Sequence, residues 1–138
     1  MFDQCLYFNT SALARRLERR WAAAFQPFGL TVPQAFLLRA VLERPGCTAG
    51  ELAELLVIAR PTATRALDGL ATLALIERQE SERDGREVRI HATQAARALG
   101  AGLSAANAAV TRELKERVGE VDLGRTVSRV REVRSALE

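Results

Sequence analysis

The sequence has few of the features that mark membrane, secreted or disulfide-rich proteins. No apolar run approaches the roughly 20 residues needed to span a bilayer. The start, MFDQCLYFNT, lacks the basic segment and continuous apolar stretch of a secretory signal. Cys5 and Cys47 are the only cysteines, enough for one bridge but too few for a disulfide framework. We therefore expect one domain of 138 residues in a reduced, cytoplasmic setting, with no membrane partner.

Residues that carry catalysis or bind metals are equally scarce. His91 is the only histidine, so the chain has almost no residues from which to build a histidine-rich metal site or, elsewhere in the chain, a Ser-His-Asp arrangement. The sequence contains no glycine-rich phosphate loop, and no pair of carboxylates stands out from ordinary helix-surface charges. We predict no enzyme activity, no metal and no cofactor.

The basic residues are almost all arginine. The net charge is only +3, and Lys115 is the single lysine among 20 basic residues. Arginine has a planar fork that suits phosphates and guanine edges, which favours a nucleic-acid partner. The same bias also follows from codon usage in a GC-rich genome, so the positions of the arginines must decide between the two interpretations.

Helical periodicity covers most of the chain. The pattern predicts helices over about 6–25, 32–43, 49–57, 60–73 and 94–118, with a last helix after an interruption at 119–124. Thr31 is followed three residues later by Gln34, and Thr48 by Glu51, which is the pattern of a capping box. Thr93 is the expected cap of the long helix.

One segment alternates in the manner of a β-hairpin. The runs 75–79 and 87–91 flank a polar tip that contains Asp84-Gly85. Short helices followed by a hairpin make a winged helix-turn-helix, in which one helix enters a major groove and the hairpin follows the backbone. The predicted fold class is mostly α with a small β-hairpin wing (α+β). The long outer helices carry apolar stripes too large for this module, so they need each other or a second copy of the chain.

The helix that begins RPTATRALDGL separates apolar from polar residues. At about 100° per residue its apolar residues share one face: Ala63, Ala66, Leu67 and Leu70. The opposite face carries Arg65, Asp68 and Thr72, with Thr62 and Thr64 at its flanks. Threonine can bond phosphates or base edges, and arginine can bridge guanine O6 and N7. Most such faces are merely solvated, so the helix alone does not decide.

The neighbouring segments favour a role for this helix in DNA recognition. The capped segment before this helix supplies the first helix and turn of a helix-turn-helix, and the hairpin tip carries Arg83 and Arg86. A wing arginine can enter a narrow minor groove, and we expect Asp84 to hold Arg86 or another arginine in place. The alternative is a solvated tip with cancelling charges, since residues 58–91 hold as many acids as bases. The predicted DNA-binding residues are Arg60, Thr62, Thr64, Arg65, Arg83, Asp84 and Arg86.

These segments together resemble the MarR family of bacterial transcriptional regulators. The resemblance covers about residues 5–100, including GLTVPQAFLL and PGCTAGELAELLVIARPTATRALDGL, and the Asp-x-Arg wing formed by Asp84 and Arg86 is among its most specific parts. It implies a homodimer that binds a pseudo-palindromic operator, with recognition helices about one helical turn of DNA apart. The implied division is a winged helix-turn-helix over 31–92 and dimerisation helices over 1–28 and 93–138.

The chain departs from the family pattern at two places. The family's recognition helix usually has Ser or Asp at its cap, and Ala59 stands there in this chain, which weakens the cap by about 1 kcal/mol. After the wing, the Leu-Thr-x-x-Gly of the family is replaced by Ala92, Thr93 and Ala96. We therefore expect different packing at the start of the long helix.

The resemblance also implies regulation, because family members are commonly relieved by small ligands, often aromatic acids, bound between the two parts. Trp21, Phe25 and Phe36 are candidates to line a pocket for a small aromatic or phenolic effector, although aromatic residues at helical spacing are usually core. Cys5 is a redox candidate, because the OhrR-like branch senses peroxide through an N-terminal cysteine. That branch has tyrosine four residues after the cysteine, where this chain has Asn9, so a bystander cysteine is the alternative.

The sequence therefore predicts a dimeric, cytoplasmic, sequence-specific DNA-binding regulator that acts as a ligand-relieved repressor. Two other functions stay open at this point. One is a peroxide- or thiol-sensing regulator that acts through Cys5, and the other is a helical dimer that scaffolds protein partners without binding DNA. Activation in place of repression depends on operator position and leaves no mark in the sequence.

Overall fold

Helices form most of this chain, as the periodicity predicts. The computed structural model describes residues 1–80 and 87–138. Its elements are α1 (Leu6–Phe25), η1 (Gln26–Phe28), α2 (Val32–Glu43), α3 (Ala49–Leu56), α4 (Arg60–Thr72), β1 (Ile76–Glu80), β2 (Val88–Ala92), α5 (Gln94–Val118) and α6 (Glu120–Ala136). These bounds confirm the predicted order of elements, and the short 3-10 turn η1 is an addition to it. Over the described residues, no helix combines the length and the apolar character needed to cross a membrane.

Three threonines begin helices as their sequence context predicts. Thr31 Oγ1 accepts a hydrogen bond from the Gln34 backbone at 3.3 Å, and Gln34 Oε1 accepts one from the Thr31 backbone at 3.0 Å. Thr48 and Glu51 make the same reciprocal pair at the start of α3. Thr93 Oγ1 accepts from a first-turn N–H of α5. Because each cap satisfies N–H groups that the helix leaves unpaired, the starts of α2, α3 and α5 are set locally.

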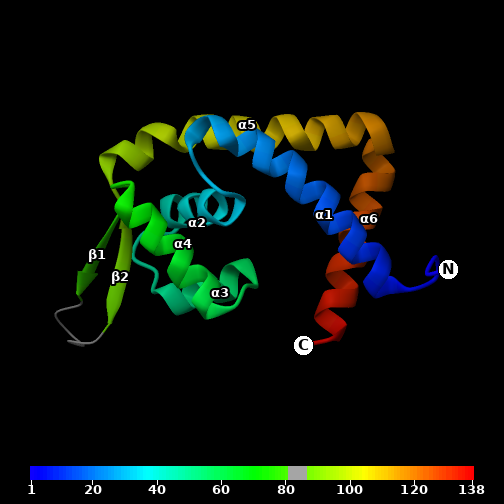
Figure 1. Ribbon diagram of the computed structural model, residues 1–138, viewed down its shortest axis with the longest axis horizontal. Coiled ribbons are helices and arrows are strands. Elements are labelled where there is room, and N and C mark those ends of the chain that lie inside the picture. The colour runs from blue at the N-terminus through cyan, green and yellow to red at the C-terminus, as the bar shows by residue number, and fades with distance from the viewer. Residues whose placement is uncertain (81–86) are drawn as a thin grey trace.

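The longest helix, α5, runs along one edge of the molecule (Figure 1). α2, α3, α4 and the hairpin lie on the side of its first half, α1 packs beside it, and α6 turns away from its C-terminal end. Gly119 makes this turn with φ 96°, a conformation that favours glycine. The predicted interruption up to Gly124 is wrong, because Gly119 suffices for the turn and α6 already begins at Glu120.

The hydrophobic core lies where α2, α3 and α4 meet α5 and the hairpin. Its largest fully buried side chains are Phe25, Leu37, Leu38, Val41, Leu52, Leu67, Leu70, Ile90 and Leu103. Burying each such leucine stabilises the fold by about 1.5–3 kcal/mol, so one core holds the short helices and the hairpin in fixed relation. α6 adds no buried residue to it.

The hairpin is antiparallel, and each strand starts one residue later than predicted. Its base is joined to the loop between α2 and α3. The Ile90 N–H donates to the Cys47 carbonyl, and the Gly46 N–H donates to the Ile90 carbonyl, both at 2.9 Å. Because Ile90 is also buried in the core, the wing is fixed at its base by both backbone and side chain.

Candidate nucleic-acid interface

α3 and α4 form a helix-turn-helix unit. Leu52 and Ala53 of α3 are buried, whereas Leu55 is 41% exposed. The turn between the helices passes through Val57, which has φ 54°, a conformation that strains a β-branched residue. The Ile58 N–H then donates to the Ala53 carbonyl at 3.0 Å and closes the turn. α4 therefore follows α3 in a defined orientation.

α4 begins without a side-chain cap. Ala59 occupies the N-cap position, and its side chain accepts no hydrogen bond from the first turn, as the sequence predicts. Pro61 lies in the first turn, where its missing N–H has no helical partner to lose. Arg60 reaches back toward α3, because a Cβ placed on Gly50 would lie 3.7 Å from Arg60 Nη1. An exposed guanidinium thus lies beside the start of α3.

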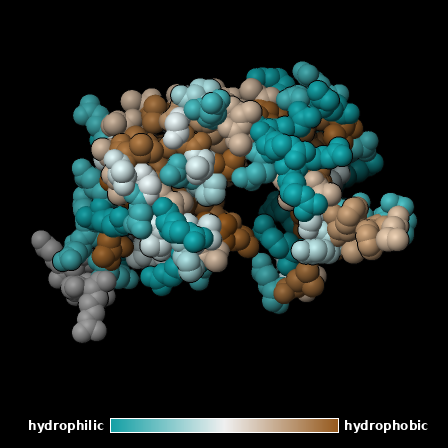
Figure 2. All heavy atoms as spheres, viewed as in Figure 1, coloured by the Kyte–Doolittle hydropathy of each residue, from teal (hydrophilic) through white to brown (hydrophobic). Residues whose placement is uncertain are grey.

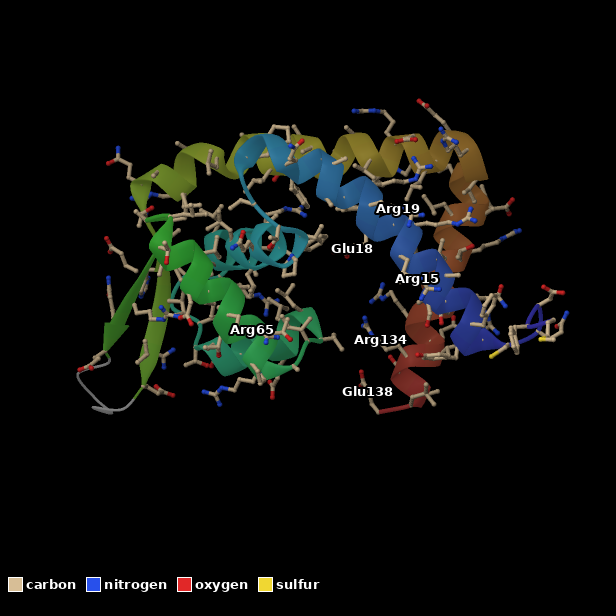
Figure 3. All side chains as sticks on the ribbon, in the orientation of Figure 1. Arg15, Glu18, Arg19, Arg65, Arg134 and Glu138 are labelled. Atoms are coloured by element: carbon tan, nitrogen blue, oxygen red, sulfur yellow. The ribbon has the colours of Figure 1, made fainter. Side chains whose placement is uncertain are left out.

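The buried and exposed sides of α4 divide as the helical wheel predicts. Its buried residues are Ala63, Ala66, Leu67 and Leu70. Arg60, Thr64 and Arg65 are exposed and Thr62 is half-buried, and Figure 3 shows Arg65 on the outer surface of α4. Short threonines beside an arginine leave this surface open to close approach by the edges of a DNA groove.

Asp68 of α4 has a partner that the sequence did not reveal. Arg78 Nη2 on β1 lies 2.6 Å from Asp68 Oδ1. The two side chains are 36% and 62% exposed respectively, so the ion pair lies at the surface. No local spacing rule links a helix residue to a strand residue ten positions later. The helical wheel therefore predicts only that Asp68 points away from the core, and it does not predict the partner.

The tip of the wing lies outside the described residues. Three predicted DNA-binding residues fall there: Arg83, Asp84 and Arg86. Their roles stay predictions. At the base of the wing, Arg89 turns toward the protein and donates to the Gly46 carbonyl at 2.8 Å. This arginine holds the hairpin against the loop between α2 and α3.

The three aromatic pocket candidates lie in different surroundings. Phe25 is fully buried and packs edge-on against Phe36, with ring centroids 5.9 Å apart. Trp21 is half-buried, and its indole N–H donates to Asn107 Oδ1 at 2.9 Å. Phe36 also lines a groove of about 560 Å³ formed by residues of α2, α3 and α5. Of the three, Phe36 is therefore the one that reaches this groove.

Both cysteines carry free thiols. Cys5 is exposed at the N-cap position of α1, and Cys47 is half-buried beside the hairpin. The Asn9 amide donates to the Cys5 carbonyl at 2.8 Å, a contact that orders the backbone and does not involve the sulfur. A redox role for Cys5 stays a prediction.

The sequence of the helix-turn-helix region matches a known family model. Residues 28–87, which contain α2, α3, α4 and the first strand of the hairpin, match the sequence model of the MarR family. No curated protein gives a significant match to the sequence.

Solved structures of transcriptional regulators share the whole fold. The regulator SlyA superposes with a TM-score of 0.86 and 25% identity, covering 97% of this chain and 94% of that one. A MarR family regulator from Listeria monocytogenes, solved with a 26mer DNA, gives a TM-score of 0.85 and 19% identity over 97% and 89% of the two chains. S. aureus MepR, solved with DNA, gives 0.86 and 17% over 99% and 100%. The chain thus matches the MarR family model over residues 28–87, and over nearly its entire length it shares the fold of solved transcriptional regulators.

Proposed function

We propose that this chain is a sequence-specific DNA-binding regulator in which α4 enters the major groove. The observation that carries the proposal is the exposed side of α4, where Thr64 and Arg65 stand on a helix whose other side is fixed in the core. The major groove of B-DNA is about 12 Å wide, admits a helix and presents a distinct pattern for each base pair. Two solved relatives of the same fold contain DNA, which supports placing DNA on this surface.

The predicted residues have roles that suit their chemistry. Arg65 bridges O6 and N7 of a guanine, while Thr62 and Thr64 bond phosphates or base edges and touch thymine methyl groups. Arg60, which lies beside the start of α3, binds a phosphate. For Arg83 and Arg86, which lie outside the described residues, we propose binding in a minor groove, where the negative potential is enhanced.

A second copy of the chain is the partner that the outer helices need. In α6 Leu123 is the one half-buried residue and all others are exposed. The large exposed apolar side chains of this helix are Val121, Val127, Val130 and Val133. The N-terminal segment exposes Phe2, Leu6 and Phe8, and Figure 2 shows hydrophobic side chains on the outside at both ends of the chain. A two-fold dimer through segments 1–28 and 93–138 would cover both sets. It would also present two copies of the DNA-binding part, 31–92, to a pseudo-palindromic operator.

Such a dimer would act in the cytoplasm as a repressor when its operator overlaps a promoter. The competing function is a helical dimer that scaffolds protein partners and does not bind DNA. The equal number of acids and bases in residues 58–91 favours this rival, because no bulk positive charge on that segment attracts DNA.

Gel shifts with duplex DNA from upstream of the protein's own gene separate the two functions. DNA binding predicts a retarded complex whose affinity falls steeply with salt, because bound counterions are released. Arg65→Ala should weaken it by about 1–3 kcal/mol, whereas Arg112→Ala removes an exposed arginine from α5 and should leave it unchanged. The absence of any complex at low salt would favour the scaffold.

We further propose that the groove beside Phe36 binds a small aromatic or phenolic acid that relieves repression. Its lining includes the apolar residues Phe36, Leu42, Leu55 and Leu56, the basic residues Arg39 and Arg44, and one acidic residue, Glu43. The guanidinium carbon of Arg39 lies 5.6 Å from the Phe36 ring centroid. Among the described residues, no acidic side chain forms an ion pair with Arg39. A guanidinium at the edge of apolar walls suits a carboxylate attached to a ring.

Benzoate, with neutral benzamide as the matched control, tests this groove. Benzoate should raise the melting temperature and release the DNA, because a ligand that prefers one state shifts the population toward it. Benzamide has the same shape without the charge and should do neither. Arg39→Gln should bind DNA normally, and benzoate should change neither its melting temperature nor its DNA binding. A variant that responds as the wild type does would place the ligand elsewhere.

A further inference from the structure

The side of α4 that we place against DNA contains one carboxylate, that of Asp68. It lies one helical turn after Thr64 and one turn before Thr72, in the same row on the helix surface. Duplex DNA carries one negative charge about every 1.7 Å along its axis. An uncompensated carboxylate in this row would therefore oppose binding.

Arg78 compensates this charge from the first strand of the wing. Its Nη2 donates to Asp68 Oδ1 at 2.6 Å, a charge-assisted hydrogen bond. Arg78 pairs across the hairpin with Ile90, which is buried in the core, so the backbone that carries Arg78 is fixed. The Thr72 hydroxyl bonds to the backbone carbonyl of Asp68 rather than to its carboxylate. Within residues 1–80 and 87–138, Arg78 is thus the side chain that neutralises Asp68.

We propose that Arg78 is a positioning residue for DNA binding, acting through Asp68 and not by touching DNA itself. The proposal rests on the proposed function, because it needs α4 to face DNA. The pair removes the repulsion between Asp68 and the phosphates, and it ties the wing to the recognition helix. Exposed ion pairs contribute little to folding stability, so the consequence of losing this one is seen in DNA binding.

The proposal predicts that neutralising the two partners has opposite effects. Arg78→Gln leaves Asp68 uncompensated and should weaken DNA binding about tenfold. Asp68→Asn should bind at least as tightly as the wild type, because it removes the repelling charge. The double variant should therefore recover most of the loss. An arginine that contacted a phosphate directly would behave differently, since the loss would persist in the double variant and the salt slope would fall by about one.

Fluorescence anisotropy with the upstream duplex, at several salt concentrations, measures all three variants. Arg20→Gln removes an ion pair remote from α4: the Arg20–Glu113 pair has the same 2.6 Å separation but joins α1 to α5, and Glu113 keeps Arg117 as a partner. Because both residues lie in the proposed dimerisation segments, size-exclusion chromatography first checks that this variant associates as the wild type does, and its DNA affinity should then be unchanged. Arg78→Lys keeps a positive charge beside Asp68 and should retain binding. Thermal melting of each variant identifies any that fails to fold, in which case Arg78→Lys and Asp68→Asn decide by their affinities.

Recovery in the double variant supports the positioning role. Equal loss in Arg78→Gln and in the double variant overturns it and makes Arg78 a phosphate contact. Unchanged affinity in Arg78→Gln also overturns it. A wild-type protein that binds no DNA would refute the proposed function, and this inference with it.

Discussion

Gly100 and Gly102 lie about half a turn apart on α5. Together they provide a test of how this helix packs. A Cβ on Gly102 would lie 2.9 Å from Cε1 and 3.2 Å from Cζ of the Phe28 ring in η1. A Cβ on Gly100 would meet only Cδ1 of Leu42, at 3.4 Å, which is close to ordinary van der Waals contact. Alanine at Gly102 therefore forces an aromatic ring to move, whereas alanine at Gly100 does not.

The two substitutions should change the free energy of unfolding in opposite directions. Replacing an interior helical glycine by alanine stabilises by about 1 kcal/mol through helix propensity. Overpacking against a ring costs about 1–3 kcal/mol. Gly102→Ala should therefore destabilise the fold by about 1 kcal/mol, while Gly100→Ala should stabilise it by nearly the full propensity gain. Because both sites lie in one helix, the difference between the variants isolates the cost of displacing Phe28.

Urea unfolding followed by circular dichroism measures this difference. The protein concentration must be held constant, since association shifts apparent stability. In a Phe28→Ala background the ring is gone, and Gly102→Ala should then stabilise as Gly100→Ala does. Equal stabilisation by Gly100→Ala and Gly102→Ala in the wild-type background would show that Phe28 moves without cost, and would refute the reasoning.

Further predictions concern the start of α4 and the turn before it. Ala59→Ser supplies the missing side-chain cap and should raise the free energy of unfolding by about 1 kcal/mol; a urea midpoint equal to that of the wild type would contradict this. Val57→Gly relieves a left-handed backbone at φ 54° worth about 1–2 kcal/mol, against about 0.4–1 kcal/mol from the freer unfolded chain. The net expectation is a modest rise in melting temperature, and a fall would show that the valine side chain makes a contact that outweighs the strain.

Helix starts and the two sides of α4 could be predicted because their causes are local. A cap bonds to groups within three residues, as with Thr31 and Gln34, and helical periodicity places Leu67 inside and Arg65 outside without knowledge of the rest of the fold. The predicted strands begin one residue too early, because strand ends depend on pairing with Ile90 and with the loop at Cys47.

What the sequence did not reveal depends on contacts between elements. The Asp68–Arg78 pair exists because the hairpin packs against α4 at one particular angle. The groove beside Arg39 exists because α3 and α5 leave space next to α2. The left-handed backbone at Val57 is imposed by the helix-turn-helix geometry, although a valine gives no sign of it. Each of these features requires the tertiary arrangement, which local patterns do not encode.

Methylation interference at guanine N7 tests the central claim most directly, because this atom lies in the major groove where α4 is proposed to bind. The account predicts two symmetric sites of interference about 10 base pairs apart, produced by Arg65 from each of two protomers and lost in Arg65→Ala. Wild-type binding that no methylated guanine disturbs, or interference that Arg65→Ala leaves unchanged, would contradict it.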